Sequence, residues 1–351
     1  MLETHHSNSL YFLTPFARER RTGGFIYNEQ IKKELEEQGW TIHQIELDAQ
    51  WPFPESPPQI PKLDVIPHQT VVVDGLILTA IAEQLFDQCV SVIALIHSPL
   101  CWEHPDAQVL KEESAVLNQC EQVIVTGHQA YTFVKQMTIA PLELVVPGIE
   151  TVHTKKTRQD IEKSILDGSR LVCIAHLIPR KGHDLLLEAL SLLTSEKWEL
   201  VCIGSVDTHP EWAKSIKKKA KQVSDQTGNP ILFLGELGKK KIDQAYQKAD
   251  LVVLTSRAEA FGMVLTEAIG MGVPILSTPA GALSILNDVA IQVECDPHSI
   301  AQGLRYWLNN LQERENYLHR VSQCTLPTWA MQANLFGQCI MDSINRFSLN
   351  T

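Results

Sequence analysis

Two glutamates separated by seven residues, Glu259 and Glu267, follow the apolar run DLVVLTS. Such a run is typical of a buried parallel strand, so we expect Glu259 at its carboxyl end and Glu267 one to two turns inside the next helix. Helix-start N–H groups attract phosphate, and carboxylates accept hydrogen bonds from hydroxyl groups. The pattern predicts a ligand with phosphate and hydroxyl groups, and a capped helix with a surface glutamate is the alternative. The N–H groups at this helix start belong to Ala260, Phe261, Gly262 and Met263.

A cluster of cations follows the apolar run LVCIAHL, which contains His176 near its end. Arg180, Lys181 and Gly182 come next and precede a helix-like segment. Ligands of doubly wound sheets bind beyond the carboxyl ends of the strands, and Lys or Arg there neutralises phosphate. The spacing predicts that Arg180 and Lys181 bind an anion, and a solvated loop is the alternative.

The first half of the chain holds a glycine pair, Gly23-Gly24, at the start of a helix predicted to run to about Gln38. Glycine lets the backbone approach a ligand closely, although a tight turn explains the pair equally well. His97 ends the apolar run SVIALIH, where a packing role is the ordinary interpretation. The GxGxxG fingerprint is absent, which argues against an NAD enzyme.

Short apolar runs alternate with segments of helical length along the chain. Near-continuous apolar runs spaced in this way indicate parallel strands covered by helices, and their number predicts two doubly wound sheets in series. The runs cover residues 10–16, 41–47, 70–78, 91–97, 121–126 and 142–147, then 171–177, 198–204, 231–235, 250–256 and 273–277.

Polar segments suggest where the domains meet. The charged stretch 151–170 predicts a hinge, so the first domain is expected to span residues 1–152 and the second residues 153–325. A break at Thr325-Leu326-Pro327 precedes residues 326–351, predicted to form a helix from Trp329 to Phe347 that packs back toward the first domain. Its apolar positions are Met331, Leu335, Phe336, Ile340 and Ile344.

Charge differs between the two halves. Residues 1–150 carry 8 Lys and Arg against 20 Asp and Glu, whereas the remainder is near neutral. An acidic first half disfavours nucleic acid and anionic lipid as partners. The lysine groups 217–221 and 239–241 lack interleaved aromatic residues, so we interpret them as solvated helix faces.

Composition also limits cofactors and location. The eight cysteines show no CxxC spacing and are expected to be buried free thiols, and no HExxH or other metal-ligand spacing occurs. We therefore expect no metal and no cofactor. A polar N-terminus and the lack of an apolar run of roughly 18 residues predict a cytoplasmic protein without a transmembrane segment.

The glutamate pair, Arg180-Lys181-Gly182, Gly23-Gly24 and the later GVPILSTPAGA together resemble the retaining glycosyltransferases of family 4. The resemblance covers nearly the whole chain. It implies the GT-B fold, in which two Rossmann-like doubly wound domains face each other across a cleft. Three positions depart from the family pattern: His176 replaces an arginine, Ala260 replaces a glycine, and an asparagine is missing before Gly148.

The resemblance implies a role for each site residue. Glu259 would contact hydroxyl groups of the donor sugar, Glu267 the ribose, and Lys181 the diphosphate. Gly24 would close over the phosphates and His97 would face the donor sugar. The predicted catalytic residues are thus His97, Lys181 and Glu259, and the predicted donor-binding residues are Gly23, Gly24, His176, Arg180, Lys181, Ala260, Phe261, Gly262, Met263 and Glu267.

The expected function is a hexosyltransferase that moves a hexosyl unit from a nucleoside diphosphate sugar to an acceptor hydroxyl, with retention. A soluble small molecule or a neutral glycan is expected as acceptor rather than an anionic lipid. Two alternatives stay open: a nucleotide-sugar epimerase of the same fold, and a nucleotide-sugar-binding protein without turnover.

Overall fold

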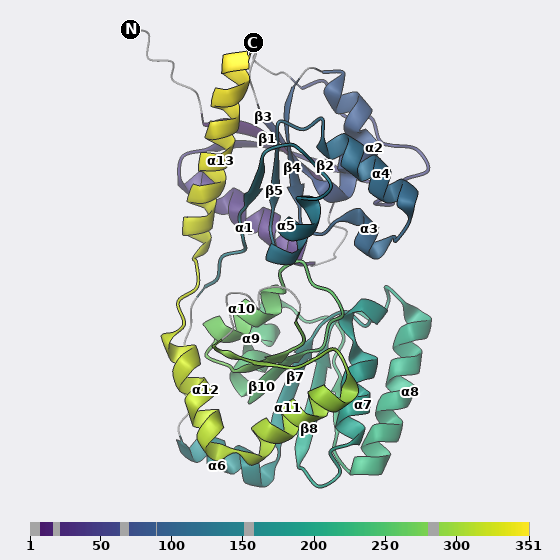
Figure 1. Ribbon diagram of the computed structural model, residues 1–351, viewed down its shortest axis with the longest axis vertical. Helices are drawn as coiled ribbons and strands as arrows, with labels where there is room; N and C mark the ends of the chain where they lie inside the picture. The colour runs from purple at the N-terminus through teal and green to yellow at the C-terminus, as the bar shows by residue number, and fades with distance from the viewer. Residues whose placement is uncertain are drawn as a thin grey trace. The chain divides into compact units, whose positions relative to one another are not determined.

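The computed structural model describes residues 8–16, 22–63, 70–88, 90–150, 158–279 and 288–350 (Figure 1). The chain divides into two compact units. Unit 1 comprises Met1–Gly148 with Pro327–Thr351, and unit 2 comprises Ile149–Leu326. The sequence prediction placed these boundaries after residues 152 and 325.

Unit 1 contains a six-stranded parallel sheet with the order β2-β1-β3-β4-β5-β6. All residues of β3 and β4 are buried, which is why these strands are apolar runs rather than alternating patterns. The strands are β1 (Ser9–Pro15), β2 (Thr41–Leu47), β3 (Thr70–Asp74), β4 (Ser91–Ile96), β5 (Gln122–Val125) and β6 (Leu142–Leu144).

Helices lie on both sides of this sheet. Figure 1 shows α1 and α13 on one side of the strands and α2 and α4 on the other. Both faces are therefore covered, as a parallel sheet requires. The helices of unit 1 are α1 (Gly23–Glu37), α2 (Gly75–Phe86), α3 (Leu100–Glu103), α4 (Ala107–Leu117), α5 (His128–Val134) and α13 (Trp329–Asn350).

The sequence predicted one strand over the apolar run 70–78, and this prediction was wrong. Strand β3 ends at Asp74, and α2 begins at Gly75. The carboxylate of Asp74 accepts a hydrogen bond from the backbone N–H of Leu76 at 2.9 Å, which caps the helix. The start of the helix could not be recognised from the sequence, because a buried strand and a buried helix both give a continuous apolar run without a distinguishing period.

Helix α13 starts where predicted, at Trp329, but its apolar face differs from the prediction. Phe336, Ile340 and Ile344 are buried, whereas Met331 is 60% exposed and Leu335 is 38% exposed. The ring of Phe336 stacks on Phe12 of β1, with the centroids 6.5 Å apart. Trp329 in the first turn is buried as well, with its ring 5.8 Å from that of Tyr27, so the helix is anchored along its length by positions other than Met331 and Leu335.

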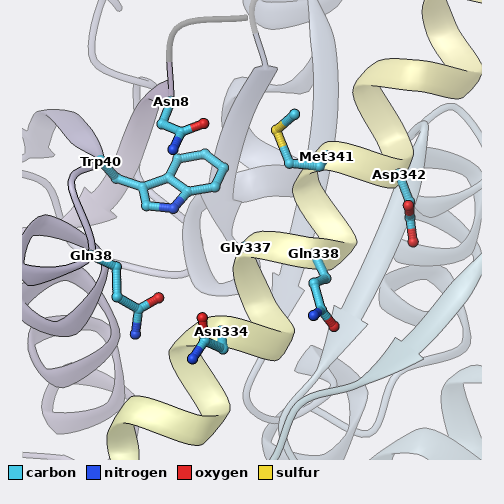
Figure 2. Close-up of a pocket in the computed structure, with 8 residues that line it drawn as sticks. All are labelled: Asn8, Gln38, Trp40, Asn334, Gly337, Gln338, Met341 and Asp342. Carbon is cyan, nitrogen blue, oxygen red and sulfur yellow. The ribbon is translucent and has the colours of Figure 1, made fainter.

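A hollow on the surface of unit 1 separates α13 from the segment before β2. Figure 2 shows Trp40 on one wall and Gly337 of α13 opposite it, with polar side chains around them. A Cβ built on Gly337 would lie 3.1 Å from Cζ2 of Trp40. The missing side chain thus lets the helix approach the indole. None of the predicted site residues lines this hollow.

Unit 2 contains a second six-stranded parallel sheet, with the order β12-β11-β10-β7-β8-β9. The edge strand β12 was not predicted, because the polar Gln292 interrupts its apolar run and no continuous apolar segment marks it. The strands are β7 (Ser169–Ile174), β8 (Trp198–Ile203), β9 (Ile231–Phe233), β10 (Leu251–Leu254), β11 (Ile275–Ser277) and β12 (Ala290–Gln292).

The helices of unit 2 pack on one another as well as on the sheet. Helix α7 contacts both α8 and α11, and α6 contacts α12. Within the described ranges, no helix is both long and apolar enough to cross a membrane. The helices are α6 (Arg158–Asp167), the 3₁₀ helix η1 (Pro179–Lys181), α7 (His183–Ser191), α8 (Pro210–Thr227), α9 (Lys239–Lys248), α10 (Met263–Gly270), α11 (Pro297–Asn309) and α12 (Leu311–Gln323).

Candidate functional site

The centre of the site in unit 2 is Glu259, which lies in the loop after β10 and is only 6% exposed. Its carboxylate binds the ammonium group of Lys181, lies 3.7 Å from the guanidinium of Arg180, and accepts a hydrogen bond from Ser256 Oγ at 2.7 Å. Burial would raise the pKa of Glu259, but the two cations and these hydrogen bonds hold it below the ordinary value. Glu259 is therefore an ionised group that fixes two cations.

A close backbone approach and a side-chain ion pair hold the loops of η1 and β10 together. Gly182 has a left-handed φ of 67°, and a Cβ built there would lie 1.9 Å from the carbonyl oxygen of Thr255. The guanidinium of Arg257 forms a two-pronged ion pair with Asp184, at 2.9 and 2.6 Å, and donates to the carbonyl of Pro179. The cations and the carboxylate thus share one rigid support.

The segment Ala260–Met263 carries backbone donors that have no acceptor among the described residues. It runs into α10 through Gly262, whose φ of 81° only glycine adopts without strain. Unpaired N–H groups at a helix start form an anion site. The side chain of Phe261 is buried, so only the backbone of this residue is available.

Glu267 lies one turn inside α10. Its carboxylate accepts a hydrogen bond of 2.8 Å from the hydroxyl of Tyr246 on α9. Burial raises the pKa of Glu267 above the ordinary value, and the Tyr246 hydroxyl and the charge of Lys239 oppose that shift only in part. A ligand hydroxyl that donates to this carboxylate would favour its ionised form.

His176, in the loop after β7, differs in character from the arginine of the family pattern. Its Nδ1 accepts a hydrogen bond from the backbone N–H of Ser205 at 3.2 Å, so that nitrogen carries no proton. The carboxylate of Glu236 lies 3.7 Å from Nδ1. Because Nδ1 is an acceptor here, this contact is not an ion pair. His176 therefore does not supply the fixed charge of an arginine.

The predicted residues of unit 1 also come together. His97 follows β4, and a Cβ built on Gly24 would lie 2.9 Å from Cδ2 of its ring. His97 Nε2 lies 2.8 Å from Asn28 Oδ1, and Asn28 Nδ2 donates to the carboxylate of Asp74 at 2.7 Å. Gly23 begins α1, as predicted, and α1 ends at Glu37.

The structure therefore groups the predicted residues into two sets, Gly23, Gly24 and His97 in unit 1 and the others in unit 2. Sequence reasoning missed Asp74, Asn28, Ser256 and Tyr246, whose side chains bind the predicted ones. Ser256 ends the apolar run before Glu259, so its position offered a signal. Tyr246 and Asn28 lie inside helices and offered none.

Asp74 is expected to make a pH-dependent contribution to the stability of unit 1. Burial would raise the pKa of Asp74, but hydrogen bonds from His97, Leu76 and Asn28 hold it below the ordinary 3.8. We expect Asp74→Ala to lower the free energy of unfolding by about 2–4 kcal/mol at about pH 7, through the lost cap and the unpaired Asn28 amide.

A group with a depressed acid pKa contributes stability that is full above its unfolded pKa and is lost as the pH falls through its folded pKa. The difference between wild type and Asp74→Ala in urea unfolding should therefore shrink as the pH falls below the ordinary aspartate value of 3.8. Asp106, an exposed cap of α4, is the matched control, and Asp106→Ala should show a smaller loss. A pH-independent difference for Asp74→Ala would contradict the assignment.

Two parallel, doubly wound units, one of them with cations, carboxylates and free amides gathered beyond its strand ends, have the architecture of the GT-B fold. Residues 155–321 match the family model described as "Glycosyl transferases group 1". This segment covers most of unit 2 and includes every predicted site residue of that unit.

Comparison with curated and solved proteins agrees with that match. The D-inositol 3-phosphate glycosyltransferase of Jonesia denitrificans is 25% identical over 195 residues, which are 51% of this chain and 46% of the relative. For three curated relatives the matched part spans between 41% and 48% of their length, somewhat less than half.

Two solved structures share the fold over nearly the whole chain. Sucrose-phosphate synthase from Thermosynechococcus elongatus has a TM-score of 0.73 at 17% identity, covering 95% of this chain and 98% of that chain. HepE of Anabaena, solved in complex with UDP and glucose, has a TM-score of 0.72 at 16% identity, covering 96% and 100%. The fold is thus GT-B, and the comparisons support an enzyme of the glycosyltransferase class.

Proposed function

We propose that this protein is a retaining hexosyltransferase that moves a hexosyl unit from a nucleoside diphosphate sugar to an acceptor hydroxyl. The observation that carries the proposal is the buried cluster in which Glu259 holds Lys181 and Arg180 beside the free amides of Ala260–Met263. This combination offers positive charge and N–H donors in one place. A diphosphate is the ligand that needs both.

Departure of the nucleotide is the step that this cluster would assist. Breaking the bond between the sugar and the diphosphate places negative charge on the leaving phosphate oxygen. Lys181, Arg180 and the amides would stabilise that charge, and such preorganised donors each contribute several kcal/mol in known enzymes. Glu259 would fix the cations and accept hydrogen bonds from the sugar hydroxyls.

The proposal extends to the acceptor and to the cofactor requirement. The excess of acidic residues in the first half supports a neutral small molecule or a neutral glycan as acceptor, rather than an anionic lipid surface. We propose that no divalent metal is needed, so transfer should persist in EDTA. The cytoplasmic location and the roles of Gly23, Gly24 and His97 toward the donor stay predictions from the sequence.

The proposal is tested first by nucleotide binding. Thermal shift with UDP, GDP and ADP would identify the base, and a ligand at 100 times its Kd stabilises by about 2.7 kcal/mol. UDP is the first choice, because HepE was solved with it. The matching sugar nucleotides are then offered with a panel of neutral acceptors, and NMR reads the anomeric configuration of the product.

The same assay separates the alternatives. Release of nucleoside diphosphate only in the presence of an acceptor, with an α-linked product from an α-linked donor, supports the proposal. An altered sugar nucleotide without acceptor would indicate an epimerase. Donor binding without turnover on any acceptor would indicate a binding protein, and an inverted product would contradict retention.

Glu267→Ala is expected to weaken nucleotide binding by about 1.5–3 kcal/mol, because the ribose hydroxyls would lose a charged acceptor. Isothermal titration calorimetry with the nucleotide identified above measures the change. Glu188 on α7, exposed and paired with Lys219 at 3.2 Å, is the matched control, and Glu188→Ala should leave the affinity unchanged.

The raised pKa of Glu267 also predicts that nucleotide binding depends on pH. Ribose hydroxyl donors favour the ionised carboxylate, so the affinity should increase as the pH rises through that raised pKa and then level off. Binding should release protons in this window, and the heat should depend on the ionisation enthalpy of the buffer. Glu267→Gln should lose both effects. An unchanged affinity in Glu267→Ala would remove Glu267 from the nucleotide site.

A further inference from the structure

Helix α1 meets the imidazole of His97 with three residues of its first turns. Gly24 lies against Cδ2 of the ring, Tyr27 makes an edge contact with centroids 5.2 Å apart, and Asn28 bonds to Nε2. These positions are spaced i, i+3 and i+4, so they share one face of the helix. The start of α1, which carries Gly23 and Gly24, therefore packs against the His97 ring, and Tyr27 also donates to the carbonyl of Val145 at 2.9 Å and contacts Trp329.

Asp74 decides which nitrogen of His97 carries a proton. The pKa of Asp74 is lowered and the side chain is buried, so it is an ionised group that only accepts hydrogen bonds. Asn28 must therefore turn its NH₂ group toward Asp74, as the 2.7 Å contact shows, and its oxygen toward His97. That oxygen only accepts, so Nε2 of His97 must be the protonated nitrogen.

The other ring nitrogen is also engaged inside unit 1. Nδ1 of His97 lies 3.3 Å from the hydroxyl of Thr126, a residue that is 3% exposed. In the Nε2–H tautomer, Nδ1 accepts from that hydroxyl. Both nitrogens then have partners in the fold, which fixes the orientation of the ring against α1.

We propose that His97 and Asp74 are positioning residues: together with Asn28 they hold the first turn of α1, so that the Gly23-Gly24 backbone keeps the geometry required to meet the donor phosphates. The role that this geometry supports for His97 is to hold α1 in place. This inference rests on the proposed function for the role of the glycines, but the tautomer and the support of α1 do not depend on it.

The tautomer is tested first, without any activity measurement. The imidazole ¹⁵N resonances of the labelled full chain are recorded by two-bond correlation NMR, and His97 is assigned from the signals missing in His97→Gln. We expect Nε2 at the shift of a protonated nitrogen and Nδ1 at that of an unprotonated one. The opposite tautomer, or a ring that exchanges freely between the two, would overturn the inference.

Support of α1 is tested by hydrogen exchange read by mass spectrometry on the peptide that contains Gly24 to Asn28. Exchange should accelerate at least about tenfold in His97→Ala, and His97→Gln should restore most of the protection, because its amide can donate to Asn28. Asp74→Asn should give an intermediate result, since an amide no longer fixes the orientation of Asn28. Unchanged exchange in His97→Ala would contradict the supporting role.

Kinetics with the active donor then distinguish positioning from proton transfer. His97→Ala should raise the donor KM at least about tenfold, and His97→Gln should recover most of that loss, with a pH dependence of kcat like that of wild type. If His97→Gln keeps the protection of α1 but loses kcat or the form of the pH profile, His97 acts chemically. An inactive wild type would contradict the proposed function, whereas the tautomer and exchange results would still stand.

Discussion

Glu259→Gln should lower kcat/KM for the donor about 100-fold, equivalent to about 2.7 kcal/mol. Glutamine keeps the size of the side chain but removes the charge that holds Lys181 and Arg180. The two cations would then be free to leave the position in which they stabilise the departing diphosphate. Initial rates with the sugar nucleotide identified by binding measure the effect.

A double-mutant cycle with Lys181→Met sharpens this prediction. If Glu259 acts by positioning Lys181, the two losses should be far from additive, and the double variant should be little worse than the more severe single variant. Fully additive losses would show that Glu259 and Lys181 act independently. Glu188→Gln, which alters an exposed ion pair on α7, should retain wild-type rates.

Arg314→Ala should lower the free energy of unfolding of unit 2 by about 3–5 kcal/mol. Arg314 is 1% exposed, and its guanidinium donates to the carbonyls of Trp307 and Leu308 and to the hydroxyls of Ser164 and Ser169, at 2.8 to 3.0 Å. Alanine would leave these acceptors unpaired and open a cavity. Guanidinium unfolding followed by circular dichroism measures the loss.

Arg305 on α11 is the matched control for Arg314. Arg305 is also an arginine with several hydrogen bonds. Its partners are the carboxylate of Glu196 and the carbonyl of Leu192, and its side chain is 47% exposed. Arg305→Ala should cost less than about 1 kcal/mol. Arg314→Met, which refills the volume but leaves the acceptors unpaired, should fall between the two. Equal effects of Arg314→Ala and Arg305→Ala would contradict the structural role of the buried group.

The parallel strands could be predicted because burial on both faces of a sheet requires continuous apolar runs, which are visible in the sequence. Strand β10 contains no polar residue and β4 contains only one, and helix-length segments separate the strands. The same reasoning wrongly predicted a strand at 75–78, because the start of α2 is as apolar as the strand before it. It also missed β12, whose apolar run is interrupted by the exposed Gln292.

The site was predicted in its residue types and in part of its geometry. Glu259, Lys181 and Arg180 were expected at strand ends, and parallel strands bring such ends to one edge. The ion pair of Lys181 and Glu259 joins residues 78 positions apart, and no local pattern encodes it. The partners Tyr246 and Asn28 lie on helix faces, where a site residue and a core residue have the same spacing.

The close approach of Gly182 to Thr255 has a consequence for anyone who maps this protein by saturation mutagenesis. Every L-residue at position 182 would bring its Cβ into the carbonyl of Thr255 and strain the backbone as well. Fitness scores would then rank Gly182 beside Lys181 and Glu259, although it has no side chain with which to touch a substrate. Intolerance at this position would report steric exclusion, and only a comparison of protein abundance with activity would separate it from chemistry.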